Sequence, residues 1–528
     1  MNFTGRRVFF KKWTSKIIKN MAIIGELIKR AIELSNNVIS NPDPVTAQRD
    51  VLTDLLQKAQ DTAFGRAHDF RGIMAKIDLH EAFASRVPYY DYDRIYSEWW
   101  KDVYEGKENI TWPGKPGYFA LSSGTTSNTK NIPVTDEMLT SIRNAGIRQV
   151  LSLAEFDLPS SFFQKEVLML GSSTNLKEVK GHLEGEISGI SAYNLPFWFK
   201  GFYRPGPEIS AIDDWDERVE QIAIKAPQWD IGGLSGIPSW IELMLKKVIE
   251  HNKADNIHDI WPNLQVYTSG GVSYDPYRKS FDRIFARPVI IVDTYLASEG
   301  YLATQVRSKT DAMALLTNNG IFFEFVPLEP DNIRDDGTLR ENAKAITLDQ
   351  VEEEKDYIVI ISTVAGAWRY MIGDTVKFTD REKAEIKITG RTKSFMNVVG
   401  SQLSEFQMIR AMEELESKNG LDILEFTVSA VRNGEDYSHC WYLGCKEASR
   451  VDEEKLAGQL DSILKEHNKN YKVARTKALK SVQVNVVPAQ IFYDWAEATR
   501  KKGGQTKVPK VMREEQFKDW EDFLGKTS

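Results

Sequence analysis

A run of small hydroxyl residues around one glycine is the first feature that could do chemistry. The run is Ser122, Ser123, Gly124, Thr125 and Thr126. It follows a short predicted strand at 118–121, and Lys130 stands shortly after it. Backbone N–H groups and hydroxyls in such a loop can wrap phosphate oxygens, and Gly124 lets the backbone approach them closely. The run is not a Walker A loop, because the Gly-Lys-Ser order is absent. By composition alone, a Ser/Thr-rich surface turn is the better interpretation.

A second segment joins an aromatic residue to a carboxylate after a predicted buried strand at 288–292. It reads Asp293-Thr294-Tyr295-Leu296-Ala297-Ser298-Glu299. The ring of Tyr295 can cover a purine base, and the carboxylate of Glu299 can hold Mg²⁺ against triphosphate oxygens. Taken alone, Tyr295 is more often a core aromatic and Glu299 a solvated charge. The segment therefore predicts a nucleotide site only in combination with others.

Glycine-containing turns and one aspartate complete the candidate site. The segment Trp368-Arg369-Tyr370-Met371-Ile372-Gly373-Asp374 ends in a carboxylate that can accept hydrogen bonds from both hydroxyls of a ribose. Gly270 and Gly271 follow another predicted strand, at 264–267, and would bring main chain against an adenine base or an α-phosphate. Gly-Asp and Gly-Gly pairs are also common in simple turns.

In residue type and in order along the chain, these segments resemble the motifs of the adenylate-forming superfamily, which includes acyl-CoA ligases, luciferases and peptide-synthetase adenylation domains. The whole pattern most resembles the plant auxin-responsive acyl-acid amido synthetases and their microbial relatives. Two segments favour that branch. One is Arg369-Tyr370 before Ile372-Gly373-Asp374, and the other is 505–510, which looks like the family's C-terminal Gln-x-Lys-x-Pro-Arg. The resemblance covers nearly the whole chain, from about 21 to 511.

The sequence departs from that pattern at three positions. Leu296 replaces the glycine of the superfamily's aromatic-Gly-x-Thr-Glu motif, and Met371 replaces the family's second arginine. Gln402 stands before Glu405 where the plant enzymes carry a lysine. In this interpretation, one contact to the phosphates is lost.

The resemblance implies a ligase that uses ATP and Mg²⁺ to activate a small carboxylic acid as its acyl-adenylate. The acyl group then passes to an amine, such as an amino acid, and an amide forms. Glu299 is implied as the metal ligand and, together with Lys507, as a catalytic residue. Nucleotide contacts are implied for Ser122, Ser123, Gly124, Thr125, Thr126, Gly270, Gly271, Thr294, Tyr295, Asp374 and Arg391. Taken alone, Lys507 is one more cation in a basic loop.

The acid itself is expected between the sheet and a predicted helix at 138–153. Arg143 and Arg148 on this helix are candidates to orient a carboxylate through bidentate hydrogen bonds. Phe162 and Tyr193 are candidates for the lining of the pocket, without a choice between them. Closure of a small C-terminal domain is expected to keep water away from the acyl-adenylate.

Two other interpretations stay open. A ligase that makes a CoA thioester shares the adenylation step and its motifs, and a catalytically silent nucleotide-binding or adenylate-sensing protein can keep the same fold. The motifs identify neither the acid nor the acceptor amine, and they say nothing of the oligomeric state.

The apolar pattern predicts an α/β architecture. Helical spacing of apolar residues from 21 to about 70 predicts a helical opening, after which short apolar runs alternate with helical patterns. The predicted strands are 118–121, 166–170, 264–267, 288–292, 321–325 and 357–361. Asp275 and Pro276 together are typical of a helix start. We therefore predict a large domain with a helical opening and layered sheets.

A boundary near the Gly390-Arg391 pair divides the chain into three predicted parts. These are a basic N-terminal extension at 1–20, an ATP- and acyl-acid-binding domain at 21–392, and a mobile α/β domain at 393–528. The last domain is expected to contain a hairpin that turns at Asn433-Gly434, one amphipathic helix and a Val-rich strand at 482–487. The apolar face of that helix is predicted from Leu456, Leu460 and Ile463.

Charge and composition disfavour several functional classes. A formal net charge of −7 and a pI of about 5.7 give the chain no overall attraction for nucleic acid. No run approaches the ~18 apolar residues that cross a bilayer, so stable membrane association is not expected. Cys440 and Cys445 lack partner ligands for zinc. They are predicted to be core thiols of a protein of the reducing cytoplasm.

Overall fold

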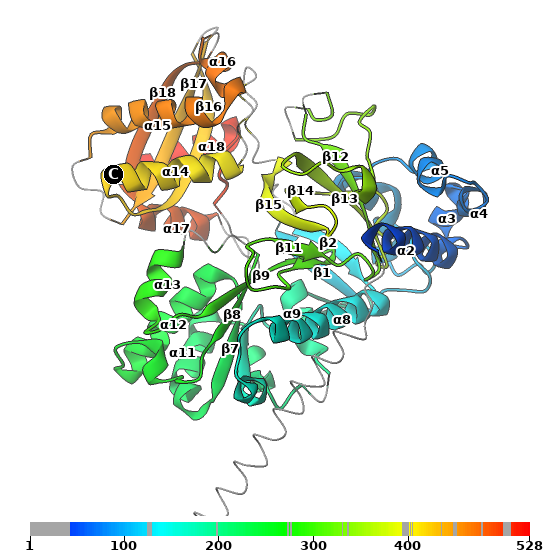
Figure 1. The fold of residues 1–528 in the computed structure, drawn as a ribbon, viewed down its shortest axis with the longest axis horizontal. Coiled ribbons are helices and arrows are strands. Elements are labelled where there is room, and N and C mark those ends of the chain that lie inside the picture. Colours follow the sequence, from blue (N-terminus) through cyan, green and yellow to red (C-terminus); the bar gives the residue numbers. More distant parts are fainter. Residues whose placement is uncertain are drawn as a thin grey trace, which may run out of the picture.

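The computed structural model shows a mixed α/β protein with a large N-terminal domain and a smaller C-terminal domain, as predicted (Figure 1). The structure describes residues 43–123, 129–196, 199–271, 274, 277–329, 331–334, 337–392, 396, 401, 403, 405–433, 436–446, 451–476, 479–499 and 508–527. Several predicted features lie outside these ranges. They are the basic extension at 1–20, Gly124, Thr125, Thr126, Asp275, Pro276, Gln402, Gly434 and Lys507.

Short helices form the first part of the described chain. They are α2 (Pro44–Ala59), α3 (Ala63–Ala67), α4 (Phe70–Met74), α5 (Leu79–Arg86), α6 (Tyr92–Ile95), the π-helix η1 (Tyr96–Trp100) and α7 (Lys101–Tyr104). Helix α2 begins at Pro44 because the Asp43 side chain accepts a hydrogen bond from the backbone of Thr46. Its apolar face, with Leu55 and Leu56, packs into the main core. The predicted helical opening is confirmed for its described part, and it extends well beyond residue 70.

A mixed sheet of 11 strands forms the centre of the large domain, in the order β12-β13-β14-β15-β11-β10-β9-β8-β7-β3-β6. Strands β6, β3, β7, β8 and β9 run parallel, and all further neighbours pair antiparallel. The bounds are β3 (Glu166–Leu170), β6 (Tyr203–Arg204), β7 (Ile231–Gly236), β8 (Val266–Gly270), β9 (Ile290–Ala297), β10 (Gly300–Thr304), β11 (Met313–Leu315), β12 (Ile321–Pro327), β13 (Asp356–Thr363), β14 (Tyr370–Asp380) and β15 (Glu385–Arg391).

All six predicted strands are present, and all of them except the one at 166–170 end later than predicted. Strand β8 continues to Gly270 and β9 to Ala297, past the apolar runs that predicted them. Both extensions pair with neighbouring strands, since Gly270 lies opposite Thr294 in the parallel register. Backbone hydrogen bonds to neighbouring strands therefore extend β8 and β9 beyond their apolar runs, into the polar residues that follow.

A second sheet and a set of helices surround the large sheet. The four-stranded sheet has the order β2-β1-β5-β4, with β1 (Tyr118–Ser123), β2 (Thr129–Val134), β4 (Lys177–Val179) and β5 (His182–Gly185). The helices are α8 (Asp136–Ser152), η2 (Leu153–Glu155), η3 (Ser160–Gln164), α9 (Ile187–Tyr193), α10 (Pro207–Ser210), α11 (Trp215–Lys225), η4 (Ala226–Gln228), α12 (Pro238–Asn252), η5 (Ile257–Asp259), α13 (Arg278–Ile284) and η7 (Leu348–Gln350). Among the described helices, none is long and apolar enough to cross a bilayer.

The parallel part of the large sheet is covered on both faces. One face packs on α11, α12 and α13 through a cluster that includes Leu234, Ile241 and Phe281. The other face packs on the segment after α8 through Leu153, Phe162 and the neighbouring apolar residues. Helix α13 begins at Arg278, and the start predicted from Asp275 and Pro276 lies outside the described residues.

The small domain is a three-stranded sheet between two helical layers. Its strands, in sheet order, are β16 (Ile423–Asn433), β17 (Asp436–Cys445) and β18 (Leu479–Pro488), and its helices are α14 (Glu405–Asn419), α15 (Glu453–His467), α16 (Lys469–Thr476), α17 (Ala489–Ala498) and α18 (Glu514–Thr527). The predicted hairpin is confirmed, although Asn433 still pairs with Asp436 and so ends the strand. The predicted apolar face of α15 is confirmed as well, because Leu456, Leu460 and Ile463 are buried.

Both cysteines lie on β17, where they are buried and form no disulfide, as predicted. Burial raises the pKa of the Cys440 and Cys445 thiols to about 11. Both side chains therefore act as small apolar groups of the core.

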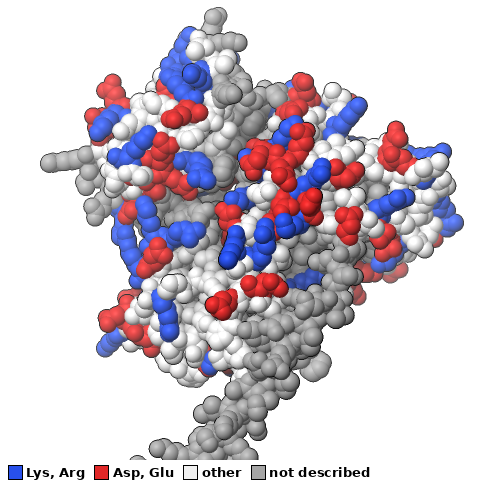
Figure 2. Space-filling view, viewed as in Figure 1, with Lys and Arg blue, Asp and Glu red and all other residues white. Residues whose placement is uncertain are grey.

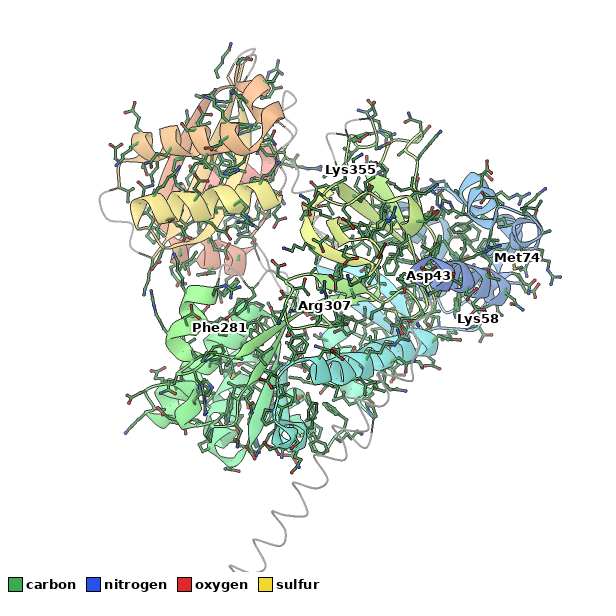
Figure 3. The ribbon with its side chains drawn as sticks, in the orientation of Figure 1. Asp43, Lys58, Met74, Phe281, Arg307 and Lys355 are labelled. Carbon is green, nitrogen blue, oxygen red and sulfur yellow. The ribbon has the colours of Figure 1, made fainter. Side chains whose placement is uncertain are left out.

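The two domains meet where α13 lies below the small domain (Figures 1 and 3; Phe281 is labelled in Figure 3). Lys279 and Arg283 of α13 stand 3.8 to 3.9 Å from the carboxylates of Glu416 and Asp422. The basic side chains are about two-thirds exposed. Figure 2 shows basic side chains gathered at this junction, at the left of the view. Pairs at such distances with exposed basic partners each contribute little to stability.

We expect the small domain to lose stability in acid because of one buried histidine. His439 of β17 is fully buried, and neither of its ring nitrogens has a hydrogen-bond partner within the described parts of the chain. Burial, together with the charge of Arg475, lowers the pKa of His439 to about 3. Unfolding lets the ring take up a proton at any pH below its ordinary pKa of about 6.5. The free energy of unfolding should therefore fall as the pH drops from about 6.5 toward 3, by up to a few kcal/mol.

Hydrogen exchange of the β17 amides at pH 8 and pH 5 measures this effect. The His439→Leu variant should lose most of the pH dependence while keeping similar protection at pH 8. His251→Gln is the control, since His251 lies in the other domain and is about one-third exposed. An equal loss of protection at pH 5 in the wild type and in His439→Leu would show that another group is responsible.

Candidate functional site

The ends of strands β8 and β9 bring main chain to the carboxyl edge of the parallel strands. Gly270 lies opposite Thr294, whose hydroxyl donates a hydrogen bond of 2.9 Å to the carbonyl of Ser269. A Cβ atom at Gly270 would lie 2.6 Å from the Thr294 Oγ1, and Gly271 has a φ of +83°. Both positions therefore require glycine. The predicted residues Gly270, Gly271 and Thr294 thus lie side by side at the edge where ligands of parallel α/β sheets bind.

Asp374 connects two of the predicted segments. The hydroxyl of Tyr295 donates a hydrogen bond of 2.6 Å to Asp374 Oδ2, and Arg391 Nε lies 3.0 Å from Asp374 Oδ1. The positions agree with the strand register, in which Asp374 of β14 pairs with Arg391 of β15. Burial and the neighbouring Asp374 charge raise the pKa of Tyr295, so its hydroxyl keeps its proton and donates. The structure buries the ring of Tyr295, and its predicted contact with a base stays a prediction.

Glu299 follows β9 and is only 7% exposed. Burial raises the pKa of its carboxyl group, the charge of Lys130 opposes the rise, and the charge of Asp374 adds to it. The Tyr370 hydroxyl, which also lowers this pKa, belongs to the same cluster. The interactions place Glu299, Lys130 and Asp374 within electrostatic reach of one another, although they come from β9, β2 and β14.

The hydroxyl-rich run begins beside this cluster. Ser122 of β1 pairs with Lys130 of β2, and Ser123 with Thr129, so the two strands frame the run at both ends. The Lys130 ammonium lies 5.3 Å from the centre of the Tyr92 ring. The described ends of the first segment therefore converge with the second and third segments, as predicted.

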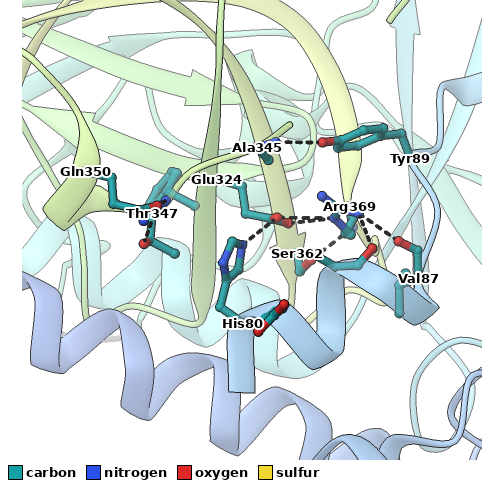
Figure 4. A network of polar contacts seen from close by, with 12 residues as sticks. His80, Val87, Tyr89, Glu324, Ala345, Thr347, Gln350, Ser362 and Arg369 are labelled. Atoms are coloured by element: carbon teal, nitrogen blue, oxygen red, sulfur yellow. Dashed lines mark hydrogen bonds and ion pairs between the residues drawn. The ribbon is translucent and has the colours of Figure 1, made fainter. Parts of the chain in front are cut away.

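A buried ion pair fixes the start of β14, just before the residues of the site (Figure 4). The Arg369 Nε donates to both carboxylate oxygens of Glu324, at 3.2 and 3.0 Å, and His80 Nε2 lies 2.9 Å from the same group. The Arg369 Nη1 also donates to the carbonyls of Ala84 and Val87 at the end of α5. Burial alone would raise the pKa of Glu324, but Arg369 and His80 outweigh it and hold the pKa below its usual value.

Sequence reasoning did not find Glu324 or His80. Glu324 is a charged residue inside the apolar strand Ile321–Pro327, and a lone carboxylate at such a position needs a buried partner. This is the signal that points to the network. Its role is to join the helical opening to the strand that carries Asp374, since Arg369 contacts both.

Helix α8 places its two candidate arginines differently. Arg143 is exposed, whereas Arg148 is half-buried and hydrogen-bonds to the side chain of Asn318. Burial lowers the pKa of Arg148. Of the candidates for the pocket lining, Phe162 is buried against the parallel strands and Tyr193 is about half exposed. The position of Arg148 is thus the better suited of the two to meet an anionic group inside the protein.

The ribose contact predicted for Asp374 implies that replacing this residue with asparagine raises the KM for ATP by about 10- to 100-fold. The change removes the charge that pairs with Arg391, and hydrogen bonds that involve an ionised group contribute roughly 1.5–3 kcal/mol. Every 1.4 kcal/mol corresponds to a factor of ten. Steady-state kinetics of acid-dependent AMP formation measures the effect. Asp380→Asn, the same change near the far end of β14, is the control, and an equal KM in both variants would contradict the role of Asp374.

Family profiles match three successive segments of the chain. The GH3 family N-terminal domain matches residues 36–224, the GH3 family central domain matches 314–391, and the GH3 family C-terminal domain matches 406–516. The chain is 28% identical over 195 residues to a jasmonoyl-L-amino acid synthetase GH3.5 of Oryza sativa subsp. japonica, across 33% of this chain and 32% of that protein. It is 23% identical over 292 residues to an indole-3-acetic acid-amido synthetase GH3.4 of Arabidopsis thaliana, across 51% and 48%. The matched region thus spans half or less of these two relatives.

Solved structures share the fold over almost the whole chain. A GH3.15 acyl acid amido synthetase superposes with a TM-score of 0.75 at 15% identity, across 94% of this chain and 96% of that one. A 2-hydroxyisobutyryl-CoA ligase in its postadenylation state superposes with a TM-score of 0.56 at 12% identity, across 92% of each chain.

Proposed function

The chain belongs to the GH3 family of auxin-responsive acyl acid amido synthetases, and from this premise we propose that it is an ATP-dependent ligase that joins a small carboxylic acid to an amine. In the first step, a carboxylate oxygen of the acid forms a bond to the α-phosphorus of ATP, and the bond to pyrophosphate breaks. In the second step, the amine attacks the acyl carbon, AMP leaves, and the amine nitrogen loses a proton. Named relatives use amino acids as acceptors, so an amino acid is the proposed amine.

The observation that carries this proposal is the cluster around Asp374. Three strands from distant parts of the sequence bring Tyr295, Asp374 and Arg391 into direct contact. Glu299 and Lys130 stand beside them, at the carboxyl edge where Gly270 and Gly271 leave the main chain uncovered. A ribose on Asp374, phosphates beside Lys130 and an acyl group toward Gly270 fit this order of groups.

The side chains of the cluster fit a bound Mg²⁺ ion. Glu299 is a buried carboxylate, and its pKa is raised because the positive charge of Lys130 does not fully offset the effect of burial. A bound cation would stabilise the ionised form of this carboxylate. No group of three or more acidic, His or Cys ligands exists within the described ranges. This suits Mg²⁺, which proteins usually hold through one or two carboxylates and the phosphates of the substrate. The bound ion would supply Lewis-acid stabilisation of charge on the phosphate oxygens.

The residues of this chain then have separate tasks. Arg391 and Tyr295 hold the Asp374 carboxylate in one orientation, which fixes where the ribose binds. Lys130 and the hydroxyl run at 122–126 offset the repulsion between the acid and the α-phosphate, as preorganised charges do. Arg148 orients the acid, and Arg143 remains a second prediction for this role.

The small domain is proposed to complete the site. Lys507 lies outside the described residues, but the segment that follows it is anchored on β16. The Thr427 hydroxyl donates 2.7 Å to the carbonyl of Pro509, and Lys510 Nζ lies 2.6 Å from Glu425. Glu425 also raises the pKa of Tyr277 at the start of α13, after burial as the larger cause, so this end of β16 faces the large domain. We propose that Lys507, which precedes this segment in the sequence, contacts the nucleotide phosphates when the domains close.

Acid-dependent exchange of labelled pyrophosphate into ATP tests the first step with a broad panel of acids. We expect exchange with at least one acid and, in the presence of amino acids, formation of an amide and AMP. Product formation with CoA alone would replace the amide proposal with a thioester ligase. ATP binding without exchange, over the whole panel, would show a silent nucleotide-binding protein instead.

A further inference from the structure

Three polar side chains form a relay between helix α8 and the large sheet. The Tyr301 hydroxyl of β10 donates a hydrogen bond of 3.0 Å to Gln149 Oε1 of α8. The same amide donates through its Nε2 to Thr268 Oγ1 of β8, at 3.1 Å. Because each group donates to the next, the relay has a direction. It ends on the hydroxyl of Thr268, which accepts from Gln149 and so keeps its own proton available for a further acceptor.

The rest of the relay is fixed by burial. Tyr301 is buried, and burial raises the pKa of its hydroxyl, so that it stays protonated and remains a donor. Gln149 is hydrogen-bonded at both ends of its amide, which holds this side chain between Tyr301 and Thr268. Thr268, in contrast, is partly exposed. Tyr301 and Gln149 thus hold the Thr268 hydroxyl group in a fixed position, from which it can donate a hydrogen bond.

Thr268 lies on the face of the sheet where the acid is proposed to bind. Alternate residues of a strand share a face, so Thr268 stands between Val266 and Gly270 on the same side of β8. Val266 is buried in an apolar cluster with Leu153 and Phe162. Gly270 marks the other end, at the proposed reacting centre. Two residues of a strand span about 6–7 Å, so an acid whose carboxyl group binds beside Gly270 would have Thr268 at about this distance from its carboxyl end.

We propose that the relay makes the enzyme select acids that carry a hydrogen-bond acceptor, such as a hydroxyl or carbonyl oxygen, on the part of the acid that lies over Thr268. The inference rests on the proposed adenylating function and adds the class of its acid. An acid that is apolar at this point would cover the Thr268 hydroxyl without a partner, which is unfavourable in a site that excludes water. A site built to hydrogen-bond a substrate group discriminates strongly against the analogue that lacks it.

The test compares matched acids in the pyrophosphate exchange assay. The panel contains straight-chain and cyclic acids, each as the parent acid and with a hydroxyl or oxo group placed about 6 Å from the carboxyl carbon; hexanoate and 5-oxohexanoate are one pair. For the best pair, we expect the wild type to favour the oxygenated acid by 10-fold or more in kcat/KM. Thr268→Val should bring this ratio close to one, and Thr268→Ser, which keeps the donor, should largely preserve it.

Gln149→Leu provides a second readout if Thr268→Val does not fold, because it removes the relay without touching the sheet. It should lower the ratio as well. A different result would contradict the inference but leave the ligase proposal standing. In that result, the wild type uses each parent acid as efficiently as its oxygenated partner, and Thr268→Val leaves the ratio of the two kcat/KM values unchanged. If no acid of the panel supports exchange, the proposed function itself fails, and this inference fails with it.

Discussion

Replacing Glu299 with glutamine should lower the rate of acid-dependent pyrophosphate exchange by about a thousandfold, the loss of about 4 kcal/mol of transition-state stabilisation. Glutamine has almost the same shape, but it cannot supply the negative charge to a metal ion on the phosphates. Because glutamine fills the same volume at this buried position, the variant should keep the local packing and fold normally. The concentration of Mg²⁺ needed for half-maximal exchange should rise at the same time.

The pH dependence gives a second readout for the same variant. Before Mg²⁺ binds, burial raises the pKa of the Glu299 carboxyl group, so protons compete with Mg²⁺ for this carboxylate as the pH drops. Exchange by the wild type should therefore decline on the acid side, and Glu299→Gln should lack that decline. Glu178→Gln, an exposed residue of β4, is the matched control. Near-normal exchange and an unchanged acid limb in Glu299→Gln would remove Glu299 from the reaction.

Replacing Arg369 with methionine should lower the free energy of unfolding of the large domain by about 3–5 kcal/mol. The side chains of Arg369 and Glu324 are 4% and 1% exposed, so the change leaves a buried carboxylate without its main partner. His80 keeps one contact with Glu324, which reduces the effect only in part. Urea denaturation measures the loss in the free energy of unfolding, and hydrogen exchange of the β12 and β14 amides shows where the protein is destabilised.

A double variant separates the charge from the packing. Changing Arg369 to methionine and Glu324 to leucine together removes the charge along with its partner, and it should recover most of the lost stability. Arg381→Met, an exposed arginine of the same domain, should have little effect. A double variant that is less stable than Arg369→Met alone would show that the two residues do not act as a buried ion pair.

The order of motifs predicted much of the site. The first motif begins at the end of β1, the second covers the end of β9, and the third begins β14. Asp374 and Tyr295 are separated by a long stretch of sequence, and yet their predicted convergence is confirmed by a direct hydrogen bond. The position of Arg391 beside Asp374 follows from strand register, which cannot be read from one strand at a time. The predicted membership of the family is confirmed by three successive matches.

Contacts between distant elements were beyond sequence reasoning. The bond from Tyr295 to Asp374 depends on how β9 and β14 approach each other, so the ring alone suggested stacking on a base. The partners of Arg369 come from α5 and β12, and no local pattern relates them to β14. The exposure of Arg143 follows from the face that α8 turns to the core, which its buried residues Met138, Ile142 and Ala145 define.

The small domain is a single continuous stretch of chain, and the backbone passes from the large domain to it once, between Arg391 and Glu405. One covalent tether leaves a rigid body free to turn about it, whereas two tethers would limit the rotation. The charge pairs between α13 and the small domain have exposed basic partners, and each of them contributes little to holding the two domains together. The same topology allows modular engineering, in which the C-terminal unit of a relative is fused after Arg391 without a second splice.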